Sequence, residues 1–217
     1  APLDKKTADS KPLSDFDLML GGGHITGKAL DGKAAAEMQE ALNALIEDSD
    51  DKLLFAVGDG NHSLASAKEC YRINKTENSR YALVEIVNIH DDSLEFEPIY
   101  RIIFGAEPEK VIHDFTEFTG GRYDGPDAQK FTCVFGDNKR EISVKPLSKL
   151  CLGTLQKFID RYIKENPELK VDYIHGEESL HTLASKPNTV GFIFDGMKKS
   201  ELFDAVKQDG SLPRKTF

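Results

Sequence analysis

The segment from Leu53 to Tyr71 constrains the fold of this chain more than any other. A continuous apolar run, Leu53–Val57, ends at the turn Gly58-Asp59-Gly60, and apolar residues at helical spacing follow as far as Tyr71. The run is typical of a buried strand, and Asn61 or Ser63 can cap the helix behind it. The order of strand, Gly-rich turn and helix predicts a mixed α/β protein, in which strands and helices share a core.

The residues before and after this segment predict a first unit that spans 15–105. Residues 1–14 are polar and read as a flexible leader. Three further strands and one helix are expected in this unit: strands at Phe16–Leu20, Tyr81–Ile89 and Ile99–Phe104, and a helix from Asp31 to about Asp48. The three glycines after Leu20 permit a sharp change of direction.

A second, smaller α+β unit is predicted over 106–217. Pro108 is suited to open a helix, and Phe131–Phe135 can pair with Glu141–Val144 as a hairpin. The remaining elements expected here are an amphipathic helix over Leu150–Lys164, a buried strand at Thr189–Phe194 and a short helix over Lys198–Val206.

Charge and hydropathy exclude two function classes. The 217 residues carry 37 acidic and 28 basic side chains, a formal net charge of -9, whereas a non-specific nucleic-acid binder needs an excess of Lys and Arg. No stretch approaches the roughly 20 apolar residues that cross a bilayer, so no membrane partner is expected and the cytoplasm is the predicted location. A local basic site for one small phosphorylated ligand remains open.

A second Gly-rich stretch, Gly22–Lys28, fits half of a phosphate-binding P-loop and precedes the first predicted helix. The residue after Lys28 is Ala29, so the hydroxyl that would hold magnesium is absent. We therefore interpret His24 and its neighbours as an ordinary loop.

The turn at Gly58–Ser63 carries the most promising chemistry. Backbone N–H groups and the positive end of a helix dipole together favour an anion at such a turn. Asp59 and His62 add a carboxylate and an imidazole, the groups of a general base, and are the candidate catalytic residues. Gly58, Gly60, Asn61 and Ser63 are the candidate ligand-binding residues around them. The alternative is that Asp59 and Asn61 only satisfy the turn backbone while His62 packs at a helix start.

Metal binding has little support in the pattern. The six histidines are scattered without the i, i+4 pairing of a helix-borne zinc site, and only Asp59 with His62 is compact enough to consider. No metal site is therefore predicted, and no cofactor is identified. A phosphate or a carboxylate could instead be bound by the basic residues Arg101, Arg214 and Lys215. The alternative for each of them is an ordinary ion pair at the surface.

The segment Val57–Ala65 resembles the D-G-[NH]-H-[RS] motif of the domain of unknown function 1015 family. Other stretches resemble that family in the same order: Gly21–Gly27, Glu85–Ile89, Glu97–Arg101, Val171–Gly176, which contains His175, and Leu212–Phe217. The resemblance spans nearly the whole chain after residue 14. Family members are usually longer at the N-terminus, which suggests that this is the C-terminal part of a larger protein.

The motif is more distantly similar to a turn of ParB and sulfiredoxin-like domains and of free-serine kinases. That similarity implies a ParB/sulfiredoxin-like first unit with a mixed sheet, in which Asp59 and His62 line a phosphate or a hydroxyl-bearing substrate. It also implies His175, Arg214 and Lys215 as ligand contacts. Ser63 stands where the usual Arg would be, so a phosphate clamp is missing unless Arg101 or Arg214 supplies the charge.

The sequence thus predicts a protein that binds a small phosphorylated ligand or a nucleotide at Asp59–His62, with phosphotransfer or hydrolysis as the reaction classes. The rival hypothesis is a non-catalytic interaction module, in which the motif is turn architecture. The substrate and the oligomeric state are not given by the residues.

Overall fold

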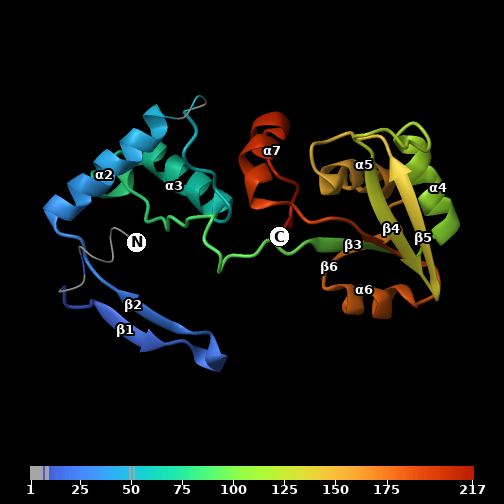
Figure 1. The fold of residues 1–217 in the computed structure, drawn as a ribbon, viewed down its shortest axis with the longest axis horizontal. Helices are drawn as coiled ribbons and strands as arrows, with labels where there is room; N and C mark the ends of the chain where they lie inside the picture. Colours follow the sequence, from blue (N-terminus) through green and yellow to red (C-terminus); the bar gives the residue numbers. More distant parts are fainter. Residues whose placement is uncertain (1–6, 8–9, 49, 51) are drawn as a thin grey trace. The chain divides into compact units, whose positions relative to one another are not determined.

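The computed structural model describes residues 7, 10–48, 50 and 52–217 (Figure 1). The chain divides into two compact units, 1–82 and 83–217. The sequence placed this boundary near residue 105. The structure places it earlier because the strand at Ile99–Phe104 pairs on both of its edges with strands of the second unit. Most of the predicted leader, residues 1–6 and 8–9, lies outside the described residues.

The first unit contains a two-stranded hairpin and two helices. Its elements are β1 (Ser14–Asp17), η1 (Met19–Gly21), β2 (His24–Gly27), α2 (Gly32–Glu47), α3 (Asn61–Ile73) and η2 (Asn78–Arg80). β1 and β2 pair antiparallel. The Asp31 carboxylate caps α2 by accepting a 2.7 Å hydrogen bond from the Ala34 N–H. Both predicted helices of this unit are confirmed.

Two predicted strands of the sequence analysis are wrong, and the strand predicted at Phe16–Leu20 is present only as far as Asp17, where β1 ends. Leu53–Val57 forms no strand, and Phe55 and Val57 are half-exposed. Tyr81–Ile89 is likewise no strand, and Leu83 is fully exposed. A strand needs a neighbour for its backbone hydrogen bonds, and no described strand pairs with either segment.

The second unit is built on a five-stranded sheet with the order β5-β4-β7-β3-β6. Its elements are β3 (Ile99–Phe104), α4 (Pro108–Phe118), β4 (Gln129–Phe135), β5 (Asn138–Val144), α5 (Cys151–Glu165), β6 (Lys170–His175), α6 (Glu177–Ala184), β7 (Thr189–Ile193), η3 (Lys199–Glu201) and α7 (Leu202–Asp209). Every pairing among the described strands is antiparallel. The predicted hairpin, the helix opened by Pro108 and the strand at Thr189 are confirmed, and so is the α+β class.

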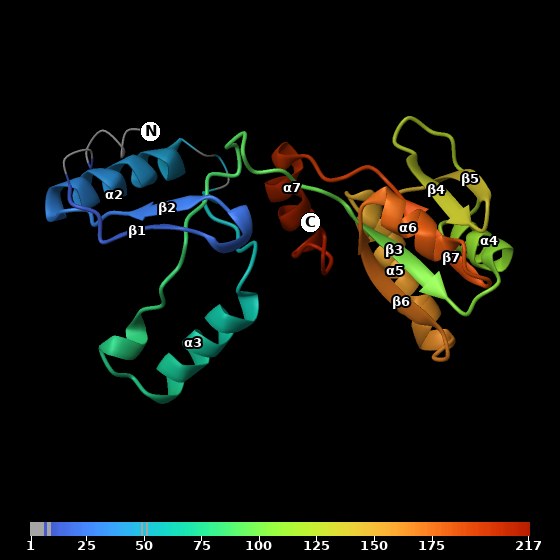
Figure 2. The same cartoon turned by 90° about the horizontal axis from the view of Figure 1, so that it is seen from below.

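Helices cover both faces of this sheet. Figures 1 and 2 show α4 and α5 on one side and α6 on the other. Phe115 of α4 packs edge-to-face on Phe192 of β7, with ring centroids 5.8 Å apart, on the first face. Leu180 of α6 is fully buried on the second face, where Gly191 lets the helix come close. The main core therefore lies in the second unit.

Among the described residues, no helix is long and apolar enough to cross a membrane.

Candidate functional site

The Gly58–Ser63 turn leads directly into helix α3. Gly60 immediately precedes the helix and has φ +79°, a left-handed conformation that glycine adopts without strain. The Asp59 carboxylate accepts a 2.7 Å hydrogen bond from the Gly60 N–H, and the Leu64 N–H makes the first helical bond, 2.9 Å, to the Gly60 carbonyl. The predicted turn-to-helix geometry is present, without the predicted strand before it.

The first turn of α3 is open to an anion. No side chain caps the helix, and no described residue accepts a hydrogen bond from the N–H groups of Asn61, His62 or Ser63. These groups carry the positive end of the helix dipole, and no acidic residue lies in the first turn. Asp59, Asn61, His62 and Ser63 are all exposed. A phosphate could therefore accept hydrogen bonds from this backbone without displacing a side chain.

The starts of α6 and α3 differ in the acidic residues of their first turns. α6 also follows a glycine of positive φ, Gly176, and also has no side-chain cap. Its first turn holds Glu177 and Glu178, whose negative charges already complement the dipole. Of these two helices, only α3 has no acidic residue within its first turn; its nearest carboxylate, Asp59, comes before Gly60 and binds the Gly60 N–H.

Arg101, predicted as a ligand contact, is fully buried in the second unit. It occupies the middle of a row across the sheet, paired with Tyr173 of β6 and Phe192 of β7. Its Nε donates to Gln156 Oε1 of α5 at 3.0 Å, and its Nη1 donates to the Ile99 carbonyl at 2.5 Å. The guanidinium is thus fixed between the sheet and α5.

The other guanidinium nitrogen of Arg101 holds the C-terminal strap, residues 213–217. Nη2 donates to the Arg214 carbonyl at 2.7 Å and to the Lys215 carbonyl at 3.0 Å. Farther along the strap, the Phe217 ring stacks on Phe96 with centroids 4.1 Å apart. The strap is therefore docked on the second unit through backbone and aromatic contacts.

Three cations surround the half-buried ring of Tyr173. The Arg101 guanidinium carbon, the Lys215 Nζ and the Arg214 guanidinium carbon lie 4.5, 4.7 and 5.7 Å from its centroid. We call Arg101, Arg214 and Lys215 the basic cluster. Burial lowers the pKa of Arg101 to about 10, and the positive charge of Arg214 acts in the same direction while Tyr173 opposes it.

His175, also predicted to bind ligand, is exposed two residues after Tyr173 on β6 and so points to the same side of the sheet. The structure thus brings Arg101, Arg214 and Lys215 together, with His175 on the same side. The Gly58–Ser63 turn belongs to the first unit. The predicted roles of all these residues in ligand binding and catalysis stay predictions.

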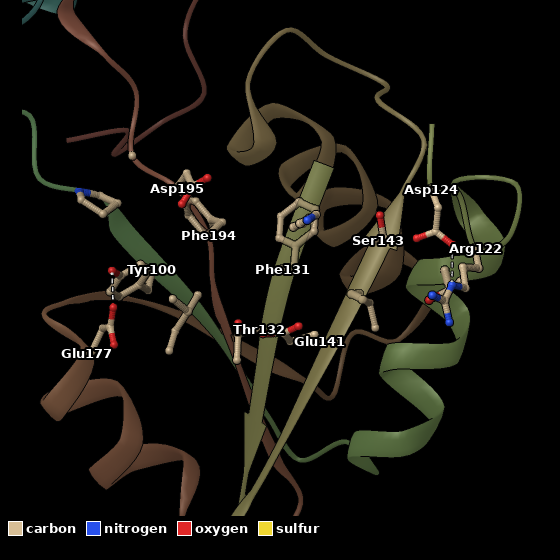
Figure 3. Close-up of a pocket in the computed structure, with 16 residues that line it drawn as sticks. Tyr100, Arg122, Asp124, Phe131, Thr132, Glu141, Ser143, Glu177, Phe194 and Asp195 are labelled. Atoms are coloured by element: carbon tan, nitrogen blue, oxygen red, sulfur yellow. Dashed lines mark hydrogen bonds and ion pairs between the residues drawn. The ribbon is translucent and has the colours of Figure 1, made fainter. Parts of the chain in front are cut away.

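A cavity of about 780 Å³ lies in the second unit, at the end of the sheet where β3 and β4 begin and β5, β6 and β7 end (Figure 3). Tyr100, Phe131 and Phe194 are among its lining residues, and the Tyr100 hydroxyl donates to Glu177 Oε1 at 3.3 Å. Burial raises the pKa of Tyr100, and the charge of Glu177 adds to that effect. The sequence analysis missed this cavity because its lining comes from four strands, helices α4 and α6, and the loops around them.

Within the described part of the chain, no group of three or more His, Cys, Asp and Glu residues is placed to hold a metal ion.

Comparison with known proteins now identifies the family. A family model described as protein of unknown function (DUF1015) matches residues 2–205, which is most of the chain. The chain belongs to the DUF1015 family. No curated protein matches this DUF1015 chain significantly.

A solved structure shares the fold of this DUF1015 protein. It is a point mutant of a free serine kinase in complex with ADP, 16% identical, with a TM-score of 0.53. The similarity covers 87% of this chain and 80% of the kinase chain. At this identity the similarity shows the fold alone, and it agrees with the distant resemblance to free-serine kinases that the motif implied.

Proposed function

We propose that this DUF1015 protein binds a phosphate group of a small phosphorylated ligand or nucleotide at the Gly58–Ser63 turn. The observation that carries the proposal is the uncapped start of α3, whose three N–H groups have no acceptor among the described residues. The ADP in the complex of the structurally similar kinase supports the same ligand class.

The turn also offers groups for chemistry on such a ligand. The Asp59 carboxylate is already oriented by the Gly60 N–H, and the exposed His62 lies in the first turn of α3. Either can accept a proton from an attacking hydroxyl or water, the step that phosphotransfer and hydrolysis share. We therefore propose Asp59 and His62 as the catalytic residues and Gly58, Gly60, Asn61 and Ser63 as the phosphate cradle.

Calorimetric titration of the protein with ADP tests the binding. Replacement of Gly60 by Ala strains a residue with φ +79° although no atom lies within 4 Å of the added Cβ, so the cradle is distorted without a steric clash. We expect Gly60→Ala to weaken ADP binding by about tenfold, the value of one hydrogen bond to a charged group. Gly32→Ala, where φ is ordinary and the space is also open, is the matched control.

The roles of Asp59 and His62 are tested separately. Asp59→Asn and His62→Ala should abolish turnover of a phosphorylated substrate while leaving ADP binding within a few-fold, because the backbone holds the phosphate. An absence of ADP binding at millimolar concentration, or equal binding in Gly60→Ala, contradicts the proposal.

A second function class, the interaction module, is favoured by one observation. Phe55 and Val57 expose about half of their surface directly before the turn, as a docking segment would. In that case His62→Ala lowers the melting temperature and changes no ligand affinity.

A further inference from the structure

The C-terminal strap adds two positive charges, Arg214 and Lys215, to that of Arg101 around the ring of Tyr173. Arg101, Arg214 and Lys215 all lie within 6 Å of one ring centroid, in a chain whose net charge is -9. Asp160 is the one carboxylate in the described structure that pairs with the cluster, through a 2.9 Å contact to Arg214. Lys215 has no carboxylate partner among the described residues. The cluster therefore carries an uncompensated positive charge.

The backbone of the strap has an unfavourable conformation at Lys215. Lys215 has φ +51°, a left-handed value that is unfavourable for a residue with a Cβ. The Arg101 guanidinium donates hydrogen bonds to the Arg214 and Lys215 carbonyls, one on each side of the Lys215 Cα, which fixes that conformation. In consequence the Lys215 ammonium lies over Tyr173, 4.7 Å from the ring centroid, and remains exposed.

The three basic residues are not equivalent. Arg101 is fully buried, and four hydrogen bonds to protein acceptors already engage its guanidinium. Arg214 keeps 65% of its side chain exposed, and Lys215 is exposed as well. Only the last two can reach a dissolved anion.

We propose that the strap is a phosphate-binding site of the second unit. Arg214 and Lys215 contact the anion, and Arg101 is a positioning residue that holds their backbone and does not touch the ligand. A phosphate suits this place because its charge offsets the repulsion among the three cations, and because the Arg214 guanidinium can donate two parallel hydrogen bonds to it. This site does not depend on the one proposed at the Gly58–Ser63 turn.

The test uses inorganic pyrophosphate as the probe, titrated calorimetrically into the whole chain at low ionic strength. Lys215→Gly is the decisive variant, because glycine accepts the left-handed backbone while the ammonium is removed. We expect pyrophosphate affinity to fall about tenfold with no drop in melting temperature. Lys170→Gln, which removes an exposed lysine from the far end of strand β6, should leave the affinity within twofold.

Arg101→Lys tests the positioning role. Lysine keeps the charge but cannot make the forked bonds to both carbonyls, so the strap should be released. We expect trypsin to cleave after Arg214 and Lys215 faster than in the wild type, as mass spectrometry detects, together with at least a tenfold loss of pyrophosphate affinity. If Arg101→Lys binds pyrophosphate normally, Arg101 has no positioning role.

The variants Gly60→Ala and Lys215→Gly distinguish the two proposed sites experimentally. Pyrophosphate binding that survives Gly60→Ala and is lost in Lys215→Gly supports the strap site, whatever happens to ADP. Binding that is unchanged in Lys215→Gly, or equally reduced in Lys170→Gln, overturns the strap site and leaves the proposed function standing.

Discussion

At the scale of single residues, the environment of His24 differs most from what the sequence suggested. The sequence analysis took it for a loop histidine, but it lies in β2 with both ring nitrogens against carboxylates of β1. Its Nδ1 is 2.7 Å from Asp17 Oδ1 and its Nε2 is 2.6 Å from Asp15 Oδ1. Both nitrogens can donate only when the ring is protonated. The hydrogen bonds that His24 donates to Asp17 and Asp15 accordingly raise the pKa of His24, and the one to Asp15 lowers the pKa of Asp15.

This arrangement predicts a pH dependence of the hairpin. Because the folded pKa of His24 lies above the ordinary 6.5, its contribution to hairpin pairing is complete below that value and is lost as pH rises through the raised pKa. An NMR titration of the His24 ring should give a midpoint above 6.5. Asp17→Asn should bring the midpoint down, and more so than Asp15→Asn, since Asp17 is the larger cause. A midpoint at or below 6.5 in the wild type contradicts the two-sided bridge.

At the scale of secondary-structure elements, the contact between α6 and the sheet depends on one residue without a side chain. A Cβ placed on Gly191 of β7 would lie 2.9 Å from Leu180 Cγ and 2.9 Å from Val134 Cγ2. Both neighbours are fully buried and cannot move aside freely. Gly191→Ala should therefore lower the free energy of unfolding by about 1 to 3 kcal/mol, as overpacking does.

Chemical denaturation of a double-mutant cycle checks this contact. Leu180→Ala removes one of the two side chains that the new methyl group meets and leaves Val134, so Gly191→Ala should cost clearly less in that background than in the wild type. Equal costs in the two backgrounds would place the effect within the sheet, in the strand backbone or against Val134, and not in the contact with α6.

The elements themselves show what periodicity can and cannot predict. Helix α2, helix α5 and the β4–β5 hairpin follow from local spacing and turn residues, and the structure confirms all three. Leu53–Val57 has the composition of a buried strand, yet composition does not say which segment pairs with it. The burial of Arg101 could not be predicted from the sequence either, because its hydrogen-bond partners, Gln156 and residues 214–215, are more than fifty positions away. The turn at Gly58–Ser63 was found from sequence because its chemistry is local.

At the scale of the whole chain, the buried core is distributed very unequally between the two units. Of the described residues up to Ala82, only Ala34 is a buried apolar residue, whereas both hydrophobic clusters are built from later residues. Burial of apolar surface is the main favourable term in folding. The second unit therefore has the means to fold cooperatively by itself, and the first unit has few buried contacts of its own.

Hydrogen exchange followed by mass spectrometry tests this inequality. Peptides from α5 and β3 should exchange through global unfolding and stay protected longest, because their residues form the main core. Peptides from α2 and α3 should exchange orders of magnitude faster, since α3 buries no residue and α2 buries only Ala34. A fragment of residues 83–217 should keep the slow exchange of α5 and the melting temperature of that transition. Protection of α3 equal to that of α5 would mean that in solution its apolar residues are covered, which would favour the interaction module over the binding site proposed at its N-terminus.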